Sequence, residues 1–146
     1  MIIDEFKRLR DLPNKVISND LTFTQTASPF IFRFDEKVFN ALGYDVILTA
    51  TYNDLLPSVV FNFRVVGNGA VCRYCVNGTV HKDEITGIPT RTHKHTPKQD
   101  GCFNNNLPVA NNRTDLTISN FSDVELIWET VCAEANIQHS GKVIKQ

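Results

Sequence analysis

Residues 44–52 read YDVILTATY, and this stretch decides the fold. Every second residue from Tyr44 to Tyr52 is apolar, and most of the residues between them are polar. A repeat of two is typical of a β-strand with one buried face and one face in water. The segments on either side have the same period, with apolar side chains at Phe30, Phe32 and Phe34 and at Val59, Phe61, Phe63 and Val65. The chain is therefore expected to form consecutive strands between about residues 16 and 76.

Short breaks with turn-forming residues separate these segments. They contain Gly43, the pair Asn53-Asp54, Pro57 and the run Gly67-Asn68-Gly69. Strands joined by such short turns run antiparallel to their neighbours and commonly bury one face. We therefore expect an antiparallel β-meander.

A helix is expected at each end of the strand region. Residues 2–12 have apolar side chains at helical spacing, acidic residues early and basic residues late, and Pro13 ends the segment. Near the C-terminus, the order Ser122 to Glu125 matches a capping box and predicts the start of a second helix. Its apolar stripe is expected to pack on the sheet. The expected class is α+β, with a single domain over residues 1–137 and a polar tail at 138–146.

Composition and charge restrict the functional classes. The 146 residues include 15 basic and 16 acidic side chains, which give a net charge of −1. A protein that binds duplex DNA by neutralising phosphates would normally have a basic excess. The sequence has no signal-peptide pattern and no apolar run of membrane-spanning length, so we expect a cytoplasmic protein without a membrane partner. In that compartment its cysteines, at positions 72, 75, 102 and 132, are expected to be reduced thiols.

The candidate site is the polar segment over residues 77–113, which contains His81, His93 and His95. A long polar loop on an apolar scaffold is commonly functional. His93 and His95 are two residues apart, so both imidazoles point the same way in an extended segment. Arg91 shares that side and Lys94 lies opposite. Such a surface could bind phosphate, transfer protons or ligate a metal, or it could be a solvated basic loop without a special task.

A structural zinc site is a further alternative, because cysteine and histidine ligands are present. Cys72 and Cys75 form a C-x-x-C pair, and the three histidines and Cys102 follow. The pair lies in a predicted strand, however, where an odd separation sends the two side chains to opposite faces. We therefore expect no metal and no cofactor, with zinc as the less favoured alternative.

The layout from Cys75 onward resembles a known family. Asn77-Gly78, His81, Pro89, His93 and His95 are the corresponding residues, and the resemblance covers roughly residues 44–137. It is to small uncharacterised bacterial and phage proteins with a domain of unknown function, related in layout to TumE-type toxins of toxin–antitoxin pairs. The resemblance implies a curved antiparallel sheet packed against the C-terminal helix, in a protein encoded on a mobile element. The chain departs from it at Thr90-Arg91-Thr92, which is inserted, and in an Asn-rich run after Gly101.

Two functional hypotheses remain, and whether the protein is an enzyme stays open, as does its oligomeric state. The favoured one is a non-catalytic protein-binding inhibitor or an anti-defence or immunity factor of a phage or mobile element. Its partner would be a host defence complex or a cognate toxin or antitoxin, bound through Arg91, Lys94, Lys98, Asn104 and Asn105. The alternative is a toxin-like module that acts on RNA, with His81, His93 and His95 as catalytic residues.

Overall fold

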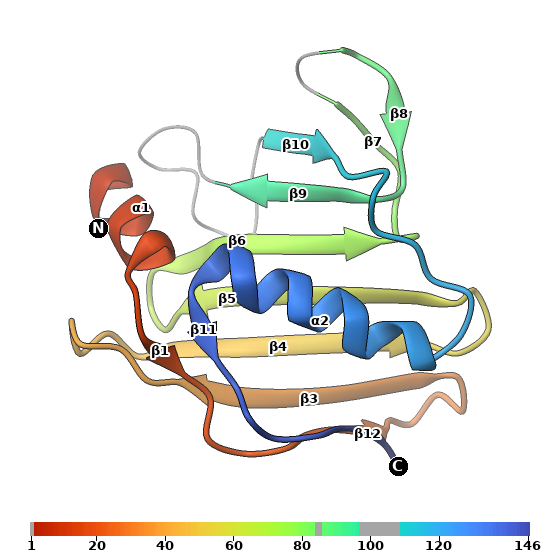
Figure 1. Ribbon diagram of the computed structural model, residues 1–146. Helices are drawn as coiled ribbons and strands as arrows, with labels where there is room; N and C mark the ends of the chain where they lie inside the picture. Colours follow the sequence, from red (N-terminus) through yellow and green to blue (C-terminus); the bar gives the residue numbers. More distant parts are fainter. Residues whose placement is uncertain (1, 84–85, 97–108) are drawn as a thin grey trace.

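The computed structural model describes residues 2–83, 86–96 and 109–146, and it has the α+β class expected from the sequence (Figure 1). In these residues, eight strands form one mostly antiparallel sheet in the order β10-β9-β6-β5-β4-β3-β2-β12. The elements are α1 (Ile3–Asp11), β1 (Lys15–Val16), β2 (Leu21–Gln25), β3 (Ile31–Val38), β4 (Val46–Asn53), β5 (Ser58–Val65), β6 (Gly69–Val76), β7 (His81–Lys82), β8 (Pro89–Thr90), β9 (His93–Thr96), β10 (Val109–Asn112), α2 (Ser122–Ala135), β11 (Ile137–Gln138) and β12 (Val143–Lys145).

The predicted meander is confirmed by the register of the long strands β3 to β6. Phe34 pairs with Ala50, Ala50 with Phe61, and Phe61 with Tyr74, so these residues form one row across four strands. All four are buried. The alternation in the sequence therefore does select one face of the sheet for the core.

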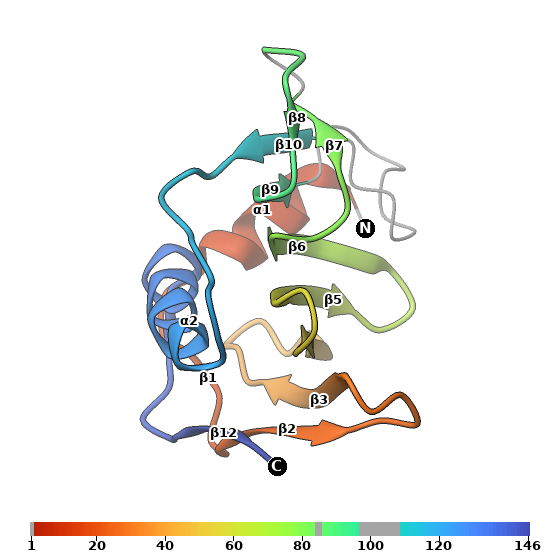
Figure 2. The same ribbon diagram turned by 90° about the vertical axis from the view of Figure 1, so that its right-hand side faces the viewer.

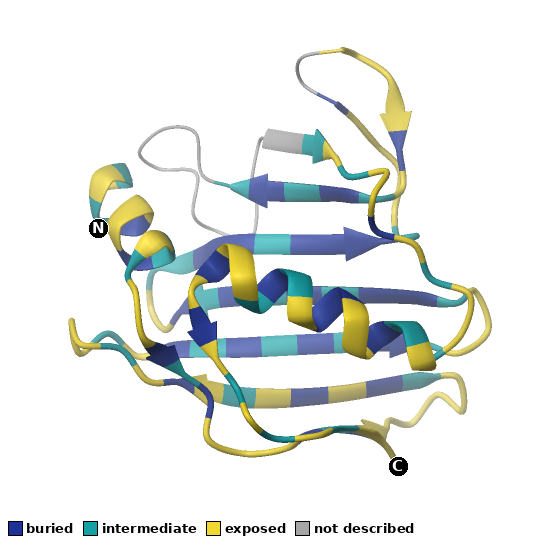
Figure 3. Ribbon diagram, in the orientation of Figure 1, coloured by how far each residue is buried: buried dark blue, intermediate teal, exposed yellow. Residues whose placement is uncertain are grey.

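Both helices cover that same face (Figures 2 and 3). On α2, the ring of Trp128 lies 5.2 Å from that of Phe61 and 6.5 Å from that of Phe63, measured between centroids. On α1, Phe6 and Leu9 are buried in the same cluster. Burial of large aromatic side chains between a helix and a sheet is a main source of stability in a domain of this size.

The second helix begins at Ser122 as predicted, but the capping contacts differ from those expected. Phe121 occupies the N-cap position, and no side chain caps the helix there. Instead, the Asp123 carboxylate accepts a hydrogen bond of 2.7 Å from the backbone N–H of Ser119, and the Asn120 side chain accepts one of 2.9 Å from that of Ser122. The first bond orders the turn before the helix, and the second satisfies the N–H of the helix's first residue.

The segment 77–113 is more regular than a single polar loop. In its described residues, β7 pairs with β8 in a small hairpin, while β9 joins the main sheet beside β6 and β10 pairs with β9. The interpretation of this segment as one solvated loop is therefore wrong. The edge of β6 leaves backbone N–H and C=O groups that need partners, and a polar strand satisfies them as well as an apolar one.

Residues 138–146, expected to form a polar tail, instead contribute to the sheets. β11 pairs in parallel with β1, and β12 pairs in parallel with β2 at the outer edge of the large sheet. Val143 packs partly buried against the core. Hydrophobicity alone does not indicate such an edge strand, because backbone hydrogen bonds supply much of its attachment.

Candidate functional site

The imidazoles of His93 and His95 lie on the face of the sheet that the helices leave uncovered. In the pairing of β6 with β9, Cys75 is opposite His93 and Arg73 is opposite His95. Strand alternation places these four side chains together on one face. Cys72 lies on the other face, where it lines a small cavity beside the helices, so the predicted divergence of Cys72 and Cys75 is confirmed.

His81 completes a group of three imidazoles. Its ring centroid is 5.0 Å from that of His93 and 5.0 Å from that of His95, and the rings of His93 and His95 are 4.5 Å apart. Each pair of rings is nearly perpendicular, with interplanar angles of 85° to 87°. The three histidines predicted from the sequence are therefore brought together. We call them, with Cys75, the imidazole–thiol cluster.

Hydrogen bonds hold the β7–β8 hairpin, and His81 with it, against the edge of the sheet. The buried Asp83 carboxylate accepts a bond of 2.8 Å from the backbone N–H of Asn112 on β10. It also accepts one of 3.1 Å from the N–H of Thr86 within the hairpin. Thr90 donates from its hydroxyl to the carbonyl of Thr92 at 2.8 Å, which links the hairpin to the start of β9. A charged acceptor makes strong hydrogen bonds in a buried setting, so Asp83 is a main anchor of the hairpin.

His93 is fully buried, and among the described residues neither of its ring nitrogens has a hydrogen-bond partner of ordinary geometry. Burial lowers the pKa of His93, the neighbouring His81 lowers it further, and the nearby backbone of Thr90 opposes this shift. A neutral imidazole still has one N–H donor and one acceptor. Leaving both unsatisfied costs free energy, so the position of His93 calls for an explanation.

Cys75 is also buried, and burial raises the pKa of its thiol to about 11, although Arg73 works in the opposite direction. The thiol is therefore protonated near neutral pH and is not an activated nucleophile. The Sγ of Cys75 and one ring nitrogen each of His93 and His95 lie within 4.8 Å of one another. A thiol and imidazoles at such distances are the ligand types that borderline and soft divalent metals select.

The predicted binding residues do not gather around this cluster. Arg91 is exposed, and its guanidinium donates to the carbonyl of Gly78 at 3.2 Å. Lys94 points to the face opposite His93 and His95, as predicted, where its Nζ lies 3.6 Å from Glu134 on α2 and 5.0 Å from the ring centroid of Tyr74. Lys98, Asn104 and Asn105, together with Cys102 of the zinc alternative, lie outside the described residues.

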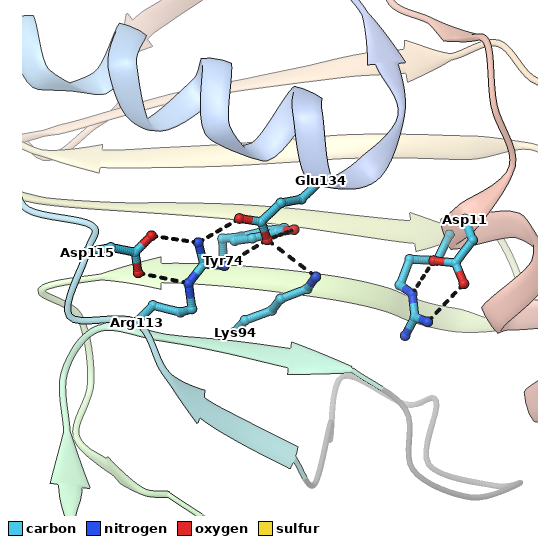
Figure 4. A network of polar contacts seen from close by, with 7 residues as sticks. Asp11, Tyr74, Lys94, Arg113, Asp115 and Glu134 are labelled. Carbon is cyan, nitrogen blue, oxygen red and sulfur yellow. Dashed lines mark hydrogen bonds and ion pairs between the residues drawn. The ribbon is translucent and has the colours of Figure 1, made fainter.

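Glu134 is the centre of a polar network that the sequence did not reveal (Figure 4). Arg113 donates to both of its carboxylate oxygens, at 2.7 and 2.6 Å, and Tyr74 donates from its hydroxyl at 3.1 Å. Arg113 also bonds to Asp115. The network joins α2 to the segment after β10 and to β6, so it fixes the strands that carry the cluster.

The uncovered side of strands β3 to β6 is a second candidate surface. We call it the open face, and its side chains are Ile31, Arg33, Asp35, Lys37, Ile47, Thr49, Thr51, Asn53, Ser58, Val60, Asn62, Arg64, Arg73 and Cys75. A shallow hollow on it is lined by Arg33, Arg64, Arg73 and other residues of these strands and of the β5–β6 turn. A second hollow runs from Asn62 and Arg73 to Cys75 and His81, so the cluster borders the open face. The sequence already indicated this surface, because every second residue of each alternating strand is mostly polar.

Comparison with known proteins adds no relative. No protein-family model matches the chain, and no curated protein and no solved structure gives a significant match. The family resemblance therefore stays a prediction. Neither helix in the described part of the chain has the length and apolar character needed to cross a bilayer.

Proposed function

We propose that the protein is a non-catalytic binding protein that recognises a protein partner with an acidic surface through the open face. The observation that carries this proposal is that both helices cover one side of the sheet (Figure 2), which leaves the largely polar side chains of the open face uncovered. Such a surface suits an inhibitor or immunity factor, which needs a stable scaffold and one accessible face. A non-catalytic protein-binding factor, the functional class that the sequence favours, thus remains the proposal.

Charge supports an acidic partner. The open face contains the cations Arg33, Lys37, Arg64 and Arg73, whereas Asp35 is the one acid among its residues. Asp35 is already engaged, since it accepts a hydrogen bond of 2.5 Å from Thr49 and lies 3.7 Å from Arg33. Complementary charge at such a surface would steer a partner toward it and fix the orientation of binding.

The side chains of the open face fit a protein better than a nucleic acid. Arginine with aliphatic residues is typical of protein interfaces, which are enriched in arginine and depleted in lysine and glutamate. Binding of single-stranded RNA commonly uses aromatic side chains on which bases stack. Every aromatic side chain of β3 to β6 is buried toward the core instead, namely Phe32, Phe34, Tyr52, Phe61, Phe63 and Tyr74.

The alternative of a catalytic module acting on RNA has less support. It would require His81, His93 and His95 to reach a phosphodiester of a polymer, and the convergence of the three rings favours it. However, His93 and His95 are only 0% and 3% exposed, and His81 is the one exposed member of the three. General acid–base catalysis needs hydrogen-bonding reach to the substrate, which the buried pair does not have.

A double charge reversal on the open face tests the proposed function. Arg33→Glu/Arg64→Glu should abolish co-purification of an acidic partner protein from cells of the native host. The matched control is Lys7→Glu/Arg8→Glu, which makes the same charge change at exposed positions of α1 on the covered side of the sheet. Binding of the purified partner should survive in the control and weaken with added salt. Equal binding by both variants, or co-purification of RNA in place of a protein, would contradict the proposal.

A further inference from the structure

We infer that Cys75, His81, His93 and His95 form a binding site for one zinc-class transition-metal ion. The inference does not depend on the proposed function, because it requires only the positions of these four side chains and no partner. Three of the four side chains come from strands of the main sheet, and the fourth comes from the β7–β8 hairpin that leans on it. Zinc is bound by cysteine thiolates and histidine nitrogens, and its structural sites have four such ligands in a tetrahedral arrangement.

The spacing of the donors suits such an ion. With zinc–nitrogen bonds of about 2.0–2.1 Å, the ring centroids of two imidazoles on one tetrahedral zinc stand roughly 5 Å apart. The three centroid distances here are 4.5, 5.0 and 5.0 Å. The donor atoms of Cys75, His93 and His95 lie within 4.8 Å of one another, and on a zinc ion they would close to about 3.5 Å. Rotations of these three side chains would cover that difference. His81 does not belong to this group of donors within 4.8 Å, so its exposed side chain would have to rotate further to supply the fourth ligand.

The burial of His93 is a second, independent observation that points to a ligand. Its two ring nitrogens are buried, and among the described residues neither makes a hydrogen bond of ordinary geometry, although the Thr90 backbone lies near the ring. Coordination by one nitrogen would satisfy the ring, and the other nitrogen could then donate to a backbone group, as metal-bound histidines usually do. The nearby Thr90 backbone is placed for that bond.

The site would be structural, because it joins short elements that hydrogen bonds, rather than apolar packing, hold against the sheet. β7 and β8 have two residues each, and β9 has four. In their described residues the hairpin strands have few buried apolar side chains, since His81, Lys82 and Pro89 are exposed. An ion held by β6, β7 and β9 would close the hairpin onto the sheet and cover the buried thiol. Binding of the metal would therefore be coupled to the stability of this edge.

The site differs from the one that the C-x-x-C pair suggests. Cys72 lies on the opposite face, beside α1 and α2, and cannot reach the ion. One cysteine of the pair is thus a ligand and the other is a core residue. Replacing each cysteine of β6 in turn therefore gives a test variant and its matched control on the same strand.

Cobalt(II) titration of the purified full chain tests the site, since Co²⁺ in a tetrahedral thiolate site gives thiolate-to-metal charge-transfer and strong d–d absorption. The wild type should bind one Co²⁺ per chain with both bands, and Zn²⁺ should displace it. Cys75→Ser should remove the charge-transfer band, and Cys72→Ser should keep it. The affinity of Cys75→Ser should fall by more than the about 10–100-fold that outer-shell substitutions cost.

A second variant keeps the test decisive if Cys75→Ser does not fold. His81 is exposed, so His81→Ala should fold normally but bind Co²⁺ at least about tenfold more weakly, with altered d–d bands. Hydrogen exchange over residues 86–92 should slow when Zn²⁺ is added to the wild type and not when it is added to His81→Ala. The inference is overturned if the folded wild type shows no stoichiometric tetrahedral spectrum, or if Cys72→Ser abolishes the thiolate band and Cys75→Ser does not.

Discussion

Cys75 and His93 are paired directly across β6 and β9, with both side chains buried on the face of the sheet opposite the helices. Directly opposite residues on antiparallel strands have Cβ atoms about 4.5–5.5 Å apart. The strand pairing therefore makes the thiol and the imidazole neighbours. This pairing turns a polar strand into part of the protein interior. It also explains why a cluster of ligand-type side chains forms at the edge of an otherwise simple meander.

The anchor of the hairpin should control the position of His81. Asp83→Ala removes the acceptor for the backbone N–H groups of Thr86 and Asn112. We expect hydrogen exchange over residues 86–92 to accelerate, and the free energy of unfolding to fall by about 1–3 kcal/mol, because buried donors lose their partner. Lys82→Ala changes an exposed residue of the same hairpin and should have little effect. Unchanged exchange in Asp83→Ala would show that other contacts hold the hairpin.

The Glu134 network should make the free energy of unfolding decrease as the pH falls into the acidic range. Burial alone would raise the pKa of Glu134, but the hydrogen bonds and charge of Arg113, with Lys94 and Tyr74, hold it below its ordinary value. A carboxylate whose pKa is lower in the folded state stabilises the protein above its unfolded-state pKa of about 4.3, and loses that contribution as the pH falls through the folded value. Glu134→Gln should therefore reduce stability at neutral pH and flatten the loss of stability in acid.

Urea unfolding at neutral and acidic pH measures that effect. We expect Glu134→Gln to lower the free energy of unfolding by about 1 kcal/mol at neutral pH, a modest value because the carboxylate is partly exposed to solvent. Glu129→Gln is the control, since Glu129 is an exposed residue of the same helix. If both variants keep the full pH dependence of the wild type, the network does not contribute as proposed.

The C-terminal strand should protect the edge of the sheet. Deleting residues 143–146 removes β12, which pairs with β2, and removes the ion pair of 3.2 Å between Lys145 and Asp54. The exposed edge of β2 should then promote association, which light scattering would detect, and unfolding should occur at lower temperature. Lys145→Gln keeps the strand but loses the ion pair and the contacts of the ammonium with the rings of Phe32, Tyr52 and Phe121, so it should remain monodisperse. Aggregation of this variant to the same extent would assign the effect to charge instead of strand pairing.

The sequence predicted the central strands of the sheet because the residues that are buried in them are the apolar ones. In β4, Val46, Leu48, Ala50 and Tyr52 are buried in the order that the alternation requires. The start of α2 was likewise visible from its capping residues and apolar stripe, although the hydrogen bonds at Asn120 and Asp123 differ from a capping box.

The sequence did not predict the burial of His93 and His95, since imidazoles normally indicate a solvated segment. Their burial arises from the pairing of β9 with β6, whose Cα partners are about 20 residues apart in the chain. The position of Lys145 over the rings of Phe32, Tyr52 and Phe121 likewise depends on long-range pairing of β12. Local patterns carry no information about such partners, so the edge strands and the cluster required the structure.

X-ray absorption at the zinc edge, measured on protein loaded with one equivalent of Zn²⁺, tests the imidazole–thiol cluster most directly. We expect one sulfur ligand at about 2.3 Å and nitrogen ligands at about 2.0–2.1 Å, with the sulfur contribution lost in Cys75→Ser and kept in Cys72→Ser. A spectrum of oxygen ligands alone, or a sulfur ligand that persists in Cys75→Ser, would contradict it.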